Sequence, residues 1–243
     1  MIHKIIKSIK FRSSKFFRKI SKHEDNDLKT IVKHLNINVH TIIDVGANVG
    51  NTVKMFQRMF PNSSIHAFEP NPTVFEKLKN NCTNIKSLTL NNLGVGDKKG
   101  SLTLNRHSNS GATSFKNPNS ITNPTYSQKI IDKIQVPVVT LSDYVQENSL
   151  SNIDLLKIDV EGFEMEVLKG ITEEYLKNNI QMIMIEANLI EKMIGQGLIE
   201  DIISVLRKNN FTLFNIYDLQ ESKNLQLYIV NLIFVNNHIL GIH

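Results

Sequence analysis

Polar side chains, most of them acidic, end five short apolar segments of the sequence. They are Asp44, Glu69, Asn92, Asp159 and Glu186, and Glu161 follows Asp159 by two residues. Carboxylates accept hydrogen bonds from hydroxyl and ammonium groups, and they can take up a proton as general bases. If the segments are parallel strands, their carboxyl ends meet at the edge of a sheet where ligands bind. One such acid has an ordinary structural explanation, but several at one edge predict a binding site.

The first of these segments leads into a glycine-containing turn, "IIDVGANVGN", over residues 42–51. Turns that bind phosphate groups present backbone N–H groups at a helix start and usually add a lysine or arginine. This turn fits neither G-x-x-x-x-G-K-[ST] nor G-x-G-x-x-G, because Ala-Asn-Val separates Gly46 from Gly50. Nearby carboxylates would also repel a pyrophosphate. They favour S-adenosylmethionine, which carries a sulfonium, an ammonium and a ribose diol but no phosphate.

Each polar or small residue at this edge then has an expected role. Gly46 lets the backbone approach the ligand, since a Cβ would collide there, and Gly50 lets the helix start pack against the strand. Asp44 can anchor the turn and accept from the ammonium, directly or through water. Glu69 can accept from both ribose hydroxyls, as acids do in dinucleotide sites. Two residues are candidates for the adenine amine: Asn92 and Asp97.

Strand-like and helix-like segments alternate along the chain and must position these residues. Apolar segments of strand length cover residues 40–46, 63–70, 86–94, 153–159, 180–188, 211–218 and 227–235. Helical patterns cover residues 51–60, 72–81, 163–170 and 198–210. This alternation predicts an α/β fold with a mostly parallel sheet covered on both faces. The last two strands have no helix between them and should form an antiparallel hairpin. Residues 97–139 interrupt this alternation and suggest hairpins and loops.

The N-terminal 22 residues differ from the rest of the chain in charge. They contain eight Lys or Arg residues and no acid, whereas the remainder contains 20 basic and 23 acidic residues. Isoleucines and phenylalanines recur in this segment at helical spacing, which predicts an amphipathic basic helix. Such a helix can bind an anionic membrane surface, or it can pack on its own domain or on a second subunit. We expect residues 1–27 to form this helix and a polar linker, and residues 28–243 to form one domain.

The composition also bears on the compartment and on partners. Cys82 is the single cysteine, so no intramolecular disulfide can form, which fits a reducing compartment. No apolar run approaches the roughly 18 residues that span a bilayer, and lysines interrupt any signal-peptide core. We expect a cytoplasmic protein, either free or held on the inner face of the membrane by residues 1–22. Because the main domain is net acidic, nucleic acid is not the expected partner.

Three motifs resemble those of a known family. "DVGANVGN", "FEPNP" and "LKIDVEGFEMEVLKG" look like the FkbM-type methyltransferases, a branch of the class I S-adenosylmethionine-dependent enzymes. The third motif is the most specific, because Asp159, Glu161 and Gly162 stand in it as D-x-E-G. "NLGVGD" and "SGATSF" add to the resemblance, which covers roughly residues 36–236. It implies a seven-stranded, Rossmann-like class I fold and usually O-methylation, often of sugars in natural products or surface glycans.

The sequence departs from the expected pattern at two positions. The general class I turn has glycine where Asn48 stands, and Ser142 occupies a helix start where an acid is expected. The residues expected to bind the cofactor are Asp44, Gly46, Asn48, Gly50, Glu69, Asn92 and Asp159. The acceptor is expected to be a small molecule or a glycan, held by the 97–139 insert. The sequence does not predict an oligomeric state.

Asp159 is the first candidate for the general base that methyl transfer to a hydroxyl group requires. Lys157 shares its side of the strand, and a lysine in an apolar strand is costly unless paired, so we expect a contact with Asp159 or Glu161. The three residues, Lys157, Asp159 and Glu161, are the candidate catalytic set. The Lys157 pair can equally be structural. His107, in the insert with Ser110 and Ser114, is an alternative base, and His66 is expected to be structural.

Other chemistries remain open at this stage. Asp159, Glu161 and Glu186 can supply oxygen ligands to Mg²⁺, which would acidify a diol, although the preferred mechanism needs no metal and no Cys/His cluster supports zinc. A nucleic-acid methyltransferase is one rival, but "EPNP" is not the N-P-P-Y type of motif. NAD-binding and non-catalytic Rossmann-like proteins are the others. A NAD-binding protein would show a closer match to G-x-G-x-x-G, and a non-catalytic protein would have lost its acidic strand ends.

Overall fold

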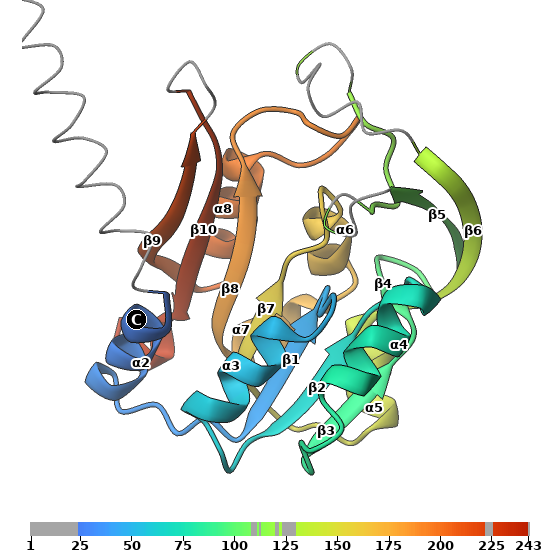
Figure 1. Ribbon diagram of the computed structural model, residues 1–243. Coiled ribbons are helices and arrows are strands. Elements are labelled where there is room, and N and C mark those ends of the chain that lie inside the picture. The colour runs from blue at the N-terminus through green and yellow to red at the C-terminus, as the bar shows by residue number, and fades with distance from the viewer. Residues whose placement is uncertain are drawn as a thin grey trace, which may run out of the picture.

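The computed structural model describes residues 24–107, 111, 113–119, 122, 130–221 and 226–242. The predicted basic helix of residues 1–22 lies outside them. A seven-stranded sheet forms the centre of the molecule (Figure 1), with the order β3-β2-β1-β7-β8-β10-β9. Its strands are β1 (Thr41–Val45), β2 (Ser64–Phe68), β3 (Leu88–Asn91), β7 (Ile153–Ile158), β8 (Ile180–Asn188), β9 (Phe211–Glu221) and β10 (Leu227–Asn236). All seven strands were predicted from the sequence.

The pairing of these strands confirms the predicted topology. β1 pairs in parallel with β2 and with β7, β2 pairs in parallel with β3, and β7 pairs in parallel with β8. β10 is antiparallel to both β8 and β9, so the last two strands form the expected hairpin. β1 and β7 lie at the centre of the sheet, which places the glycine turn beside the end of the strand that precedes Asp159.

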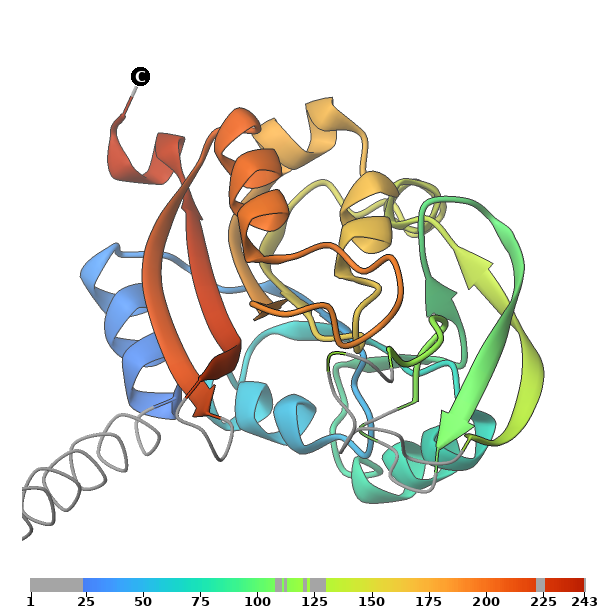
Figure 2. The ribbon, with the colours of Figure 1, turned by 90° about the horizontal axis from the view of Figure 1, so that it is seen from above.

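Helices cover both faces of the sheet, because successive apolar residues of a strand point to opposite sides. Ile42 belongs to one buried cluster and Ile43 to the other. The first cluster contains residues of α2 (Glu24–His34), α3 (Asn51–Met59) and α4 (Pro72–Asn81), and the short α9 (Asn237–Leu240) packs against it. The second contains residues of α5 (Leu141–Glu147), α6 (Glu164–Lys169), α7 (Glu173–Asn179) and α8 (Ile199–Lys208). Figure 2 shows the blue and cyan helices on one side and the yellow and orange ones on the other.

The 97–139 insert builds a separate small sheet. Its strands are β5 (Gly100–His107) and β6 (Ile130–Val139), which are antiparallel and to which β4 (Gly94–Val95) adds a short parallel strand. Arg106 on β5 donates from Nη1 to Thr73 Oγ1 at the start of α4, at 3.0 Å. The hairpin expected in this segment is therefore present, and it stands next to the carboxyl ends of β1 and β2 (Figures 1 and 2).

Three details differ from the expectations. α2 begins at Glu24, so part of the segment predicted as linker is helical. α7 was not predicted, because its seven residues are too few to show a helical period. β8 has the predicted bounds, Ile180–Asn188, but Glu186 lies two residues before the end of this strand rather than at its end. In the described parts of the chain, no helix has the length and apolar character to cross a membrane.

Candidate active site

The glycine turn is held against two neighbouring strands. The N–H groups of Gly46 and Ala47 both donate to the carbonyl of Phe68 at the end of β2, at 3.0 and 2.9 Å. Gly46 has φ +85°, and a Cβ there would lie 1.8 Å from the carbonyl oxygen of Asp159. The structure corrects the atom that a Cβ would meet, while the expected approach of this backbone to a ligand stays a prediction. The Cβ is excluded by the chain that follows β7.

Gly50 has a similar correction. It was expected to let the helix start pack on a strand, but a Cβ there would lie 2.6 Å from Cys82 Sγ and 2.8 Å from Leu78 Cδ1. Both atoms belong to the end of α4 or the residue after it. Gly50 also has φ +90°, in the left-handed region that glycine adopts easily. The second glycine of the turn thus allows α3 to begin in contact with α4.

Glu69 holds its carboxylate at the edge of this turn, as predicted from its position after β2. Its Oε2 accepts from the N–H of Asn48 at 3.0 Å, and its Oε1 accepts from the N–H of Asn71 at 2.9 Å. Only 7% of the residue is exposed. Burial raises the pKa of Glu69 to about 7, although the two N–H groups act in the opposite direction. Each oxygen keeps a second lone pair for a ligand hydroxyl.

A buried ion-pair chain lies beneath the turn. Lys157 Nζ is 3.2 Å from Asp44 Oδ1 and 3.4 Å from Asp159 Oδ2, and it donates to the carbonyl of Gly46 at 3.0 Å. The predicted contact between Lys157 and Asp159 is confirmed. Burial lowers the pKa of Lys157, but the carboxylates of Asp159 and Asp44 outweigh it and leave the pKa raised. The lysine therefore stays charged and ties the turn to β1 and β7.

The two carboxylates of this chain differ in access. The side chain of Asp44 is fully buried, whereas that of Asp159 is 38% exposed. Asp44 does not line the cavity described next, so it anchors the turn, and the arrangement offers it no direct contact with a ligand. Asp159 does line the cavity. The ion-pair chain thus fixes one carboxylate inside the fold and presents the other to the cavity.

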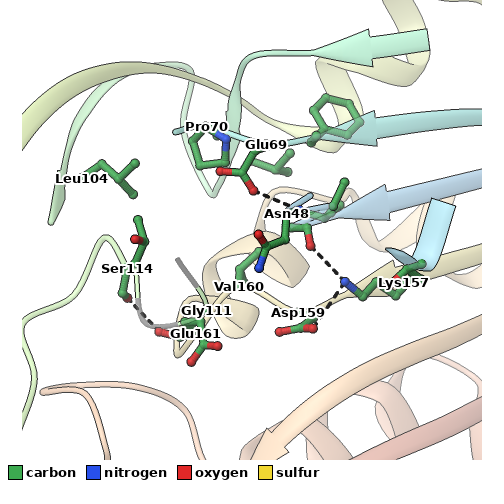
Figure 3. Close-up of a pocket in the computed structure, with 18 of the residues that line it drawn as sticks. Asn48, Glu69, Pro70, Leu104, Gly111, Ser114, Lys157, Asp159, Val160 and Glu161 are labelled. Carbon is green, nitrogen blue, oxygen red and sulfur yellow. Dashed lines mark hydrogen bonds and ion pairs between the residues drawn. The ribbon is translucent and has the colours of Figure 1, made fainter. Parts of the chain in front are cut away.

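A cavity opens above the turn, at the carboxyl ends of β1, β2 and β7. It is lined by residues from segments 45–52, 68–70, 93–95 and 157–161, together with Leu104 and the loop residues 111 and 113–115. Figure 3 shows Asn48 between Glu69 and Asp159, with Ser114 and Leu104 on the other side. Asn48 Oδ1 is buried and has no hydrogen-bond partner in the described structure. That oxygen is available to accept from an N–H or O–H group of a ligand.

The D-x-E-G turn places a second acid at the cavity. Glu161 has φ +54° and lines the cavity, and its carbonyl accepts from Ser114 Oγ at 2.7 Å. Glu164, which the sequence reasoning missed, shapes this turn: its Oε1 accepts from the N–H groups of Val160 and Gly162, both at 3.1 Å. Burial raises the pKa of Glu164. A glutamate two residues after a turn glycine, at a helix start, was the available signal.

Asp159, Glu161 and Glu186 come together as the sequence suggested. One carboxylate oxygen from each lies within 4.8 Å of the others. Burial raises the pKa of Glu186 strongly, and the charges of Asp159 and Glu161 add to the effect. The buried ammonium of Lys192 is 3.9 Å from both Glu161 and Glu186. Because a lysine already supplies positive charge at this cluster, the arrangement gives no support to the Mg²⁺ alternative.

Four other candidates lie away from the cavity lining. Asn92 donates from Nδ2 to the carbonyls of Glu69 and Pro70, and so braces the end of β2. Asp97 is exposed. His107 is buried on β5. His66 Nδ1 is 2.8 Å from the hydroxyl oxygen of Tyr144 inside the core, which confirms its structural role.

Comparison with known proteins gives a consistent result. The family model described as "Methyltransferase FkbM domain" matches residues 44–213. "Methyltransferase 1" of Beauveria bassiana is 33% identical over 147 residues, covering 55% of this chain and 59% of that protein. The "31-O-demethyl-FK506 methyltransferase FkbM" of Streptomyces tacrolimicus is 26% identical, covering 70% and 72%. The "Hexuronic acid methyltransferase AglP" of Haloferax volcanii is 26% identical, covering 65% and 60%. The chain thus spans about three fifths of the first and third relatives.

A solved structure extends this comparison to the fold. The crystal structure of Methyltransferase FkbM from Methylobacillus flagellatus matches with a TM-score of 0.50 and 14% identity, covering 80% of this chain and 44% of that chain. At this identity the match shows the fold alone. Together with the seven-stranded, mostly parallel sheet of this chain, the match confirms the predicted class I, Rossmann-like methyltransferase fold.

Proposed function

Because the chain belongs to the FkbM methyltransferase domain family, we propose that it transfers a methyl group from S-adenosylmethionine to a hydroxyl group. The observation that supports this most is the make-up of the cavity above the glycine turn. Glu69, Asp159 and Glu161 bring carboxylates to it. Its lining lysine, Lys157, is already engaged by two carboxylates. Such a lining suits a cationic ligand with sugar hydroxyls and opposes a pyrophosphate, which argues against NAD.

The residues present fit this cofactor. Glu69 would accept from the ribose hydroxyls with the free lone pairs of its two oxygens, and Asn48 Oδ1 would accept from the ammonium. The backbone of Gly46 and the carboxylate of Asp159 would complete the polar wall. When bound, the cofactor supplies a methyl group already activated by the sulfonium. The chain then has to position a nucleophile, exclude water and remove a proton.

The proton of the acceptor hydroxyl would go to Asp159. Its carboxylate faces the cavity, is partly exposed, and is held by Lys157, which leaves the outer oxygen for the acceptor. Leu104 and Phe115 from the insert form an apolar part of the lining and would reduce the access of water. In this proposal Lys157 positions the carboxylate of Asp159, and Glu161 adds negative charge beside it.

The acceptor class follows from the relatives and from the lining. The Streptomyces relative is named as a methyltransferase of 31-O-demethyl-FK506, and the Haloferax relative is named as a hexuronic acid methyltransferase. Carboxylates beside the site suit the removal of a proton from a hydroxyl group. We therefore propose a small-molecule or glycan acceptor in natural-product or glycan biosynthesis. A nucleic-acid acceptor is disfavoured because this part of the chain is net acidic.

Methyl transfer can be tested with labelled cofactor. The wild-type chain and an Asp159→Asn variant are incubated with [methyl-³H]S-adenosylmethionine and a panel of glycosides, polyols and nucleic acids, and label in each acceptor is counted. We expect the variant to lose roughly 10²-fold or more in turnover while its cofactor affinity changes little. Label transferred to nucleic acid in place of hydroxyl acceptors would contradict the proposal. An unchanged rate in the variant would move the base to Glu161, Glu186 or His107.

A further inference from the structure

A second cavity adjoins the first one. It is lined by the ends of β7 and β8, by β9 and β10, and by one residue of α3, and the two cavities share Thr52, Lys157 and Asp159. The other polar side chains of the second cavity are those of Glu186, Tyr217, Asp218, Gln220 and Asn231. Asp159 therefore separates the two spaces and belongs to both. A molecule in the second cavity would meet the same carboxylate that faces the first.

An irregularity of the hairpin builds one wall of this cavity. Tyr217 pairs with Asn231 and Gln220 pairs with Ile229, so two residues of β9 stand opposite one residue of β10. Asp218, at this bulge, has φ +47°. Neighbouring residues of a regular strand point to opposite faces, yet Tyr217 and Asp218 both line the cavity. The bulge thus turns an extra polar side chain toward the site, as bulges beside active sites do.

Glu186 gives an independent sign of a ligand. It is 7% exposed and lines the second cavity, and its Oε1 has no hydrogen-bond partner in the described structure. The ammonium of Lys192, at 3.9 Å, is an ion-pair neighbour but lies beyond hydrogen-bond distance. A buried carboxylate oxygen without a hydrogen bond is costly. An O–H or N–H donor placed in the cavity would satisfy it.

We propose that this second cavity is the acceptor subsite, and that it takes an uncharged or cationic polyhydroxylated group while rejecting a group that carries a carboxylate. The proposal rests on the function proposed above. The carboxylate of Asp218 can accept hydrogen bonds from hydroxyl groups, and the amides of Gln220 and Asn231 can both accept from them and donate to them. A hydroxyl group bound there would lie beside Asp159, which both cavities share.

The selectivity follows from the charges that face the cavity. Three acids line it: Asp159, Glu186 and Asp218. Burial raises the pKa of Glu186 and favours its neutral form, so the negative charge comes from Asp159 and Asp218. The lining ammonium of Lys157 is already bound to Asp44 and Asp159. Lys192 compensates Glu186 and Glu161 from outside the lining. The carboxylate of Asp218 accepts a hydrogen bond from the neutral amide of Asn231, whose Nδ2 is 3.3 Å away. A carboxylate on the acceptor would meet this excess of negative charge. The preference would separate this chain from its Haloferax relative, which is named for a hexuronic acid.

Three matched glycosides test the subsite: methyl glucoside, methyl glucosaminide and methyl glucuronide, which are neutral, cationic and anionic. Each is titrated into the full chain saturated with S-adenosylhomocysteine, which fills the first cavity, and binding is followed by saturation-transfer NMR. We expect the glucuronide to bind at least about 10-fold more weakly than the other two. Asp218→Asn should narrow this difference and Asn231→Asp should widen it. Asp97→Asn, which removes the same charge from an exposed position outside the cavity, should leave it unchanged.

Three outcomes of the glycoside titration would overturn the proposal. Binding of the glucuronide as strong as that of the glucoside, or no binding of any of the three, would overturn the proposal. So would an effect of Asp218→Asn no larger than that of Asp97→Asn. Binding of S-adenosylhomocysteine is measured first by calorimetry. If it fails, the proposed function fails, whereas the glycoside titration repeated on the unliganded chain still tests the subsite.

Discussion

Replacing Lys157 with methionine should destabilise the protein severely. Methionine keeps an unbranched chain of similar length but removes the ammonium that contacts Asp44, Asp159 and the carbonyl of Gly46. Asp44 is fully buried, so its carboxylate would lose its cation without gaining water. Breaking a buried pair by removing one partner costs about 3–5 kcal/mol. In a chain of this length, that corresponds to a fall in Tm of roughly 6–20 °C.

The measurement is thermal and urea unfolding of the wild type and three variants. Lys79→Met is the matched control, because Lys79 is half-exposed and pairs with Glu76 on the surface, so its loss should cost less than about 1 kcal/mol. The double variant Asp44→Asn/Lys157→Met removes the stranded charge and should recover part of the stability. The reasoning is refuted if Lys157→Met unfolds within about 1 kcal/mol of the wild type. It is also refuted if the double variant is less stable than the single Lys157→Met variant.

Two further predictions concern Glu69 and the N-terminus. The pKa of Glu69 is raised from 4.5 to about 7 in the folded state, so the folded chain holds this proton more tightly than the unfolded chain. Relative to a Glu69→Gln variant, the wild type should therefore lose about 3 kcal/mol of unfolding free energy as pH rises from 4.5 to 7, with no further change above 7. Urea unfolding of both proteins at pH 5 and pH 8 measures this loss. A difference in unfolding free energy that stays constant between the two pH values would contradict the prediction. Deleting residues 1–22 should abolish sedimentation with anionic vesicles, because each cation of this segment contributes about 1 kcal/mol to membrane binding. Tm and cofactor binding should stay nearly intact. A truncated chain that unfolds or changes oligomeric state would instead favour packing of the predicted helix on protein.

Much of the fold could be predicted because its signals are local. Apolar segments of strand length marked each strand of the central sheet, and the absence of a helical pattern between the last two indicated the antiparallel hairpin. The functions of Gly46 and Gly50 were harder, because the atoms that exclude a Cβ come from Asp159 and from α4, which are remote in sequence. A lone sequence shows that a position needs glycine, but it does not show which segment lies against it.

The candidate site shows the same limit. The ion pair of Lys157 with Asp159 followed from the two-residue period of a strand, and it is present. That Asp44 is enclosed while Asp159 is open depends on how the turn folds over β1, which no local pattern contains. The bulge at Asp218 was likewise invisible, since it arises from the register of β9 against β10. The parts that escaped prediction are therefore those set by contacts between distant segments.

In the proposed function, the cavity above the glycine turn binds S-adenosylmethionine through Glu69. Isothermal titration calorimetry of the full chain tests this directly, with Glu69→Ala as the variant and Glu76→Ala, an exposed acid on α4, as the control. We expect one binding site in the wild type and in the control. In Glu69→Ala, the loss of charge-assisted hydrogen bonds should weaken binding by about 1.5–3 kcal/mol, roughly 10- to 150-fold. No binding to the wild type, or equal affinity in Glu69→Ala, would contradict the account.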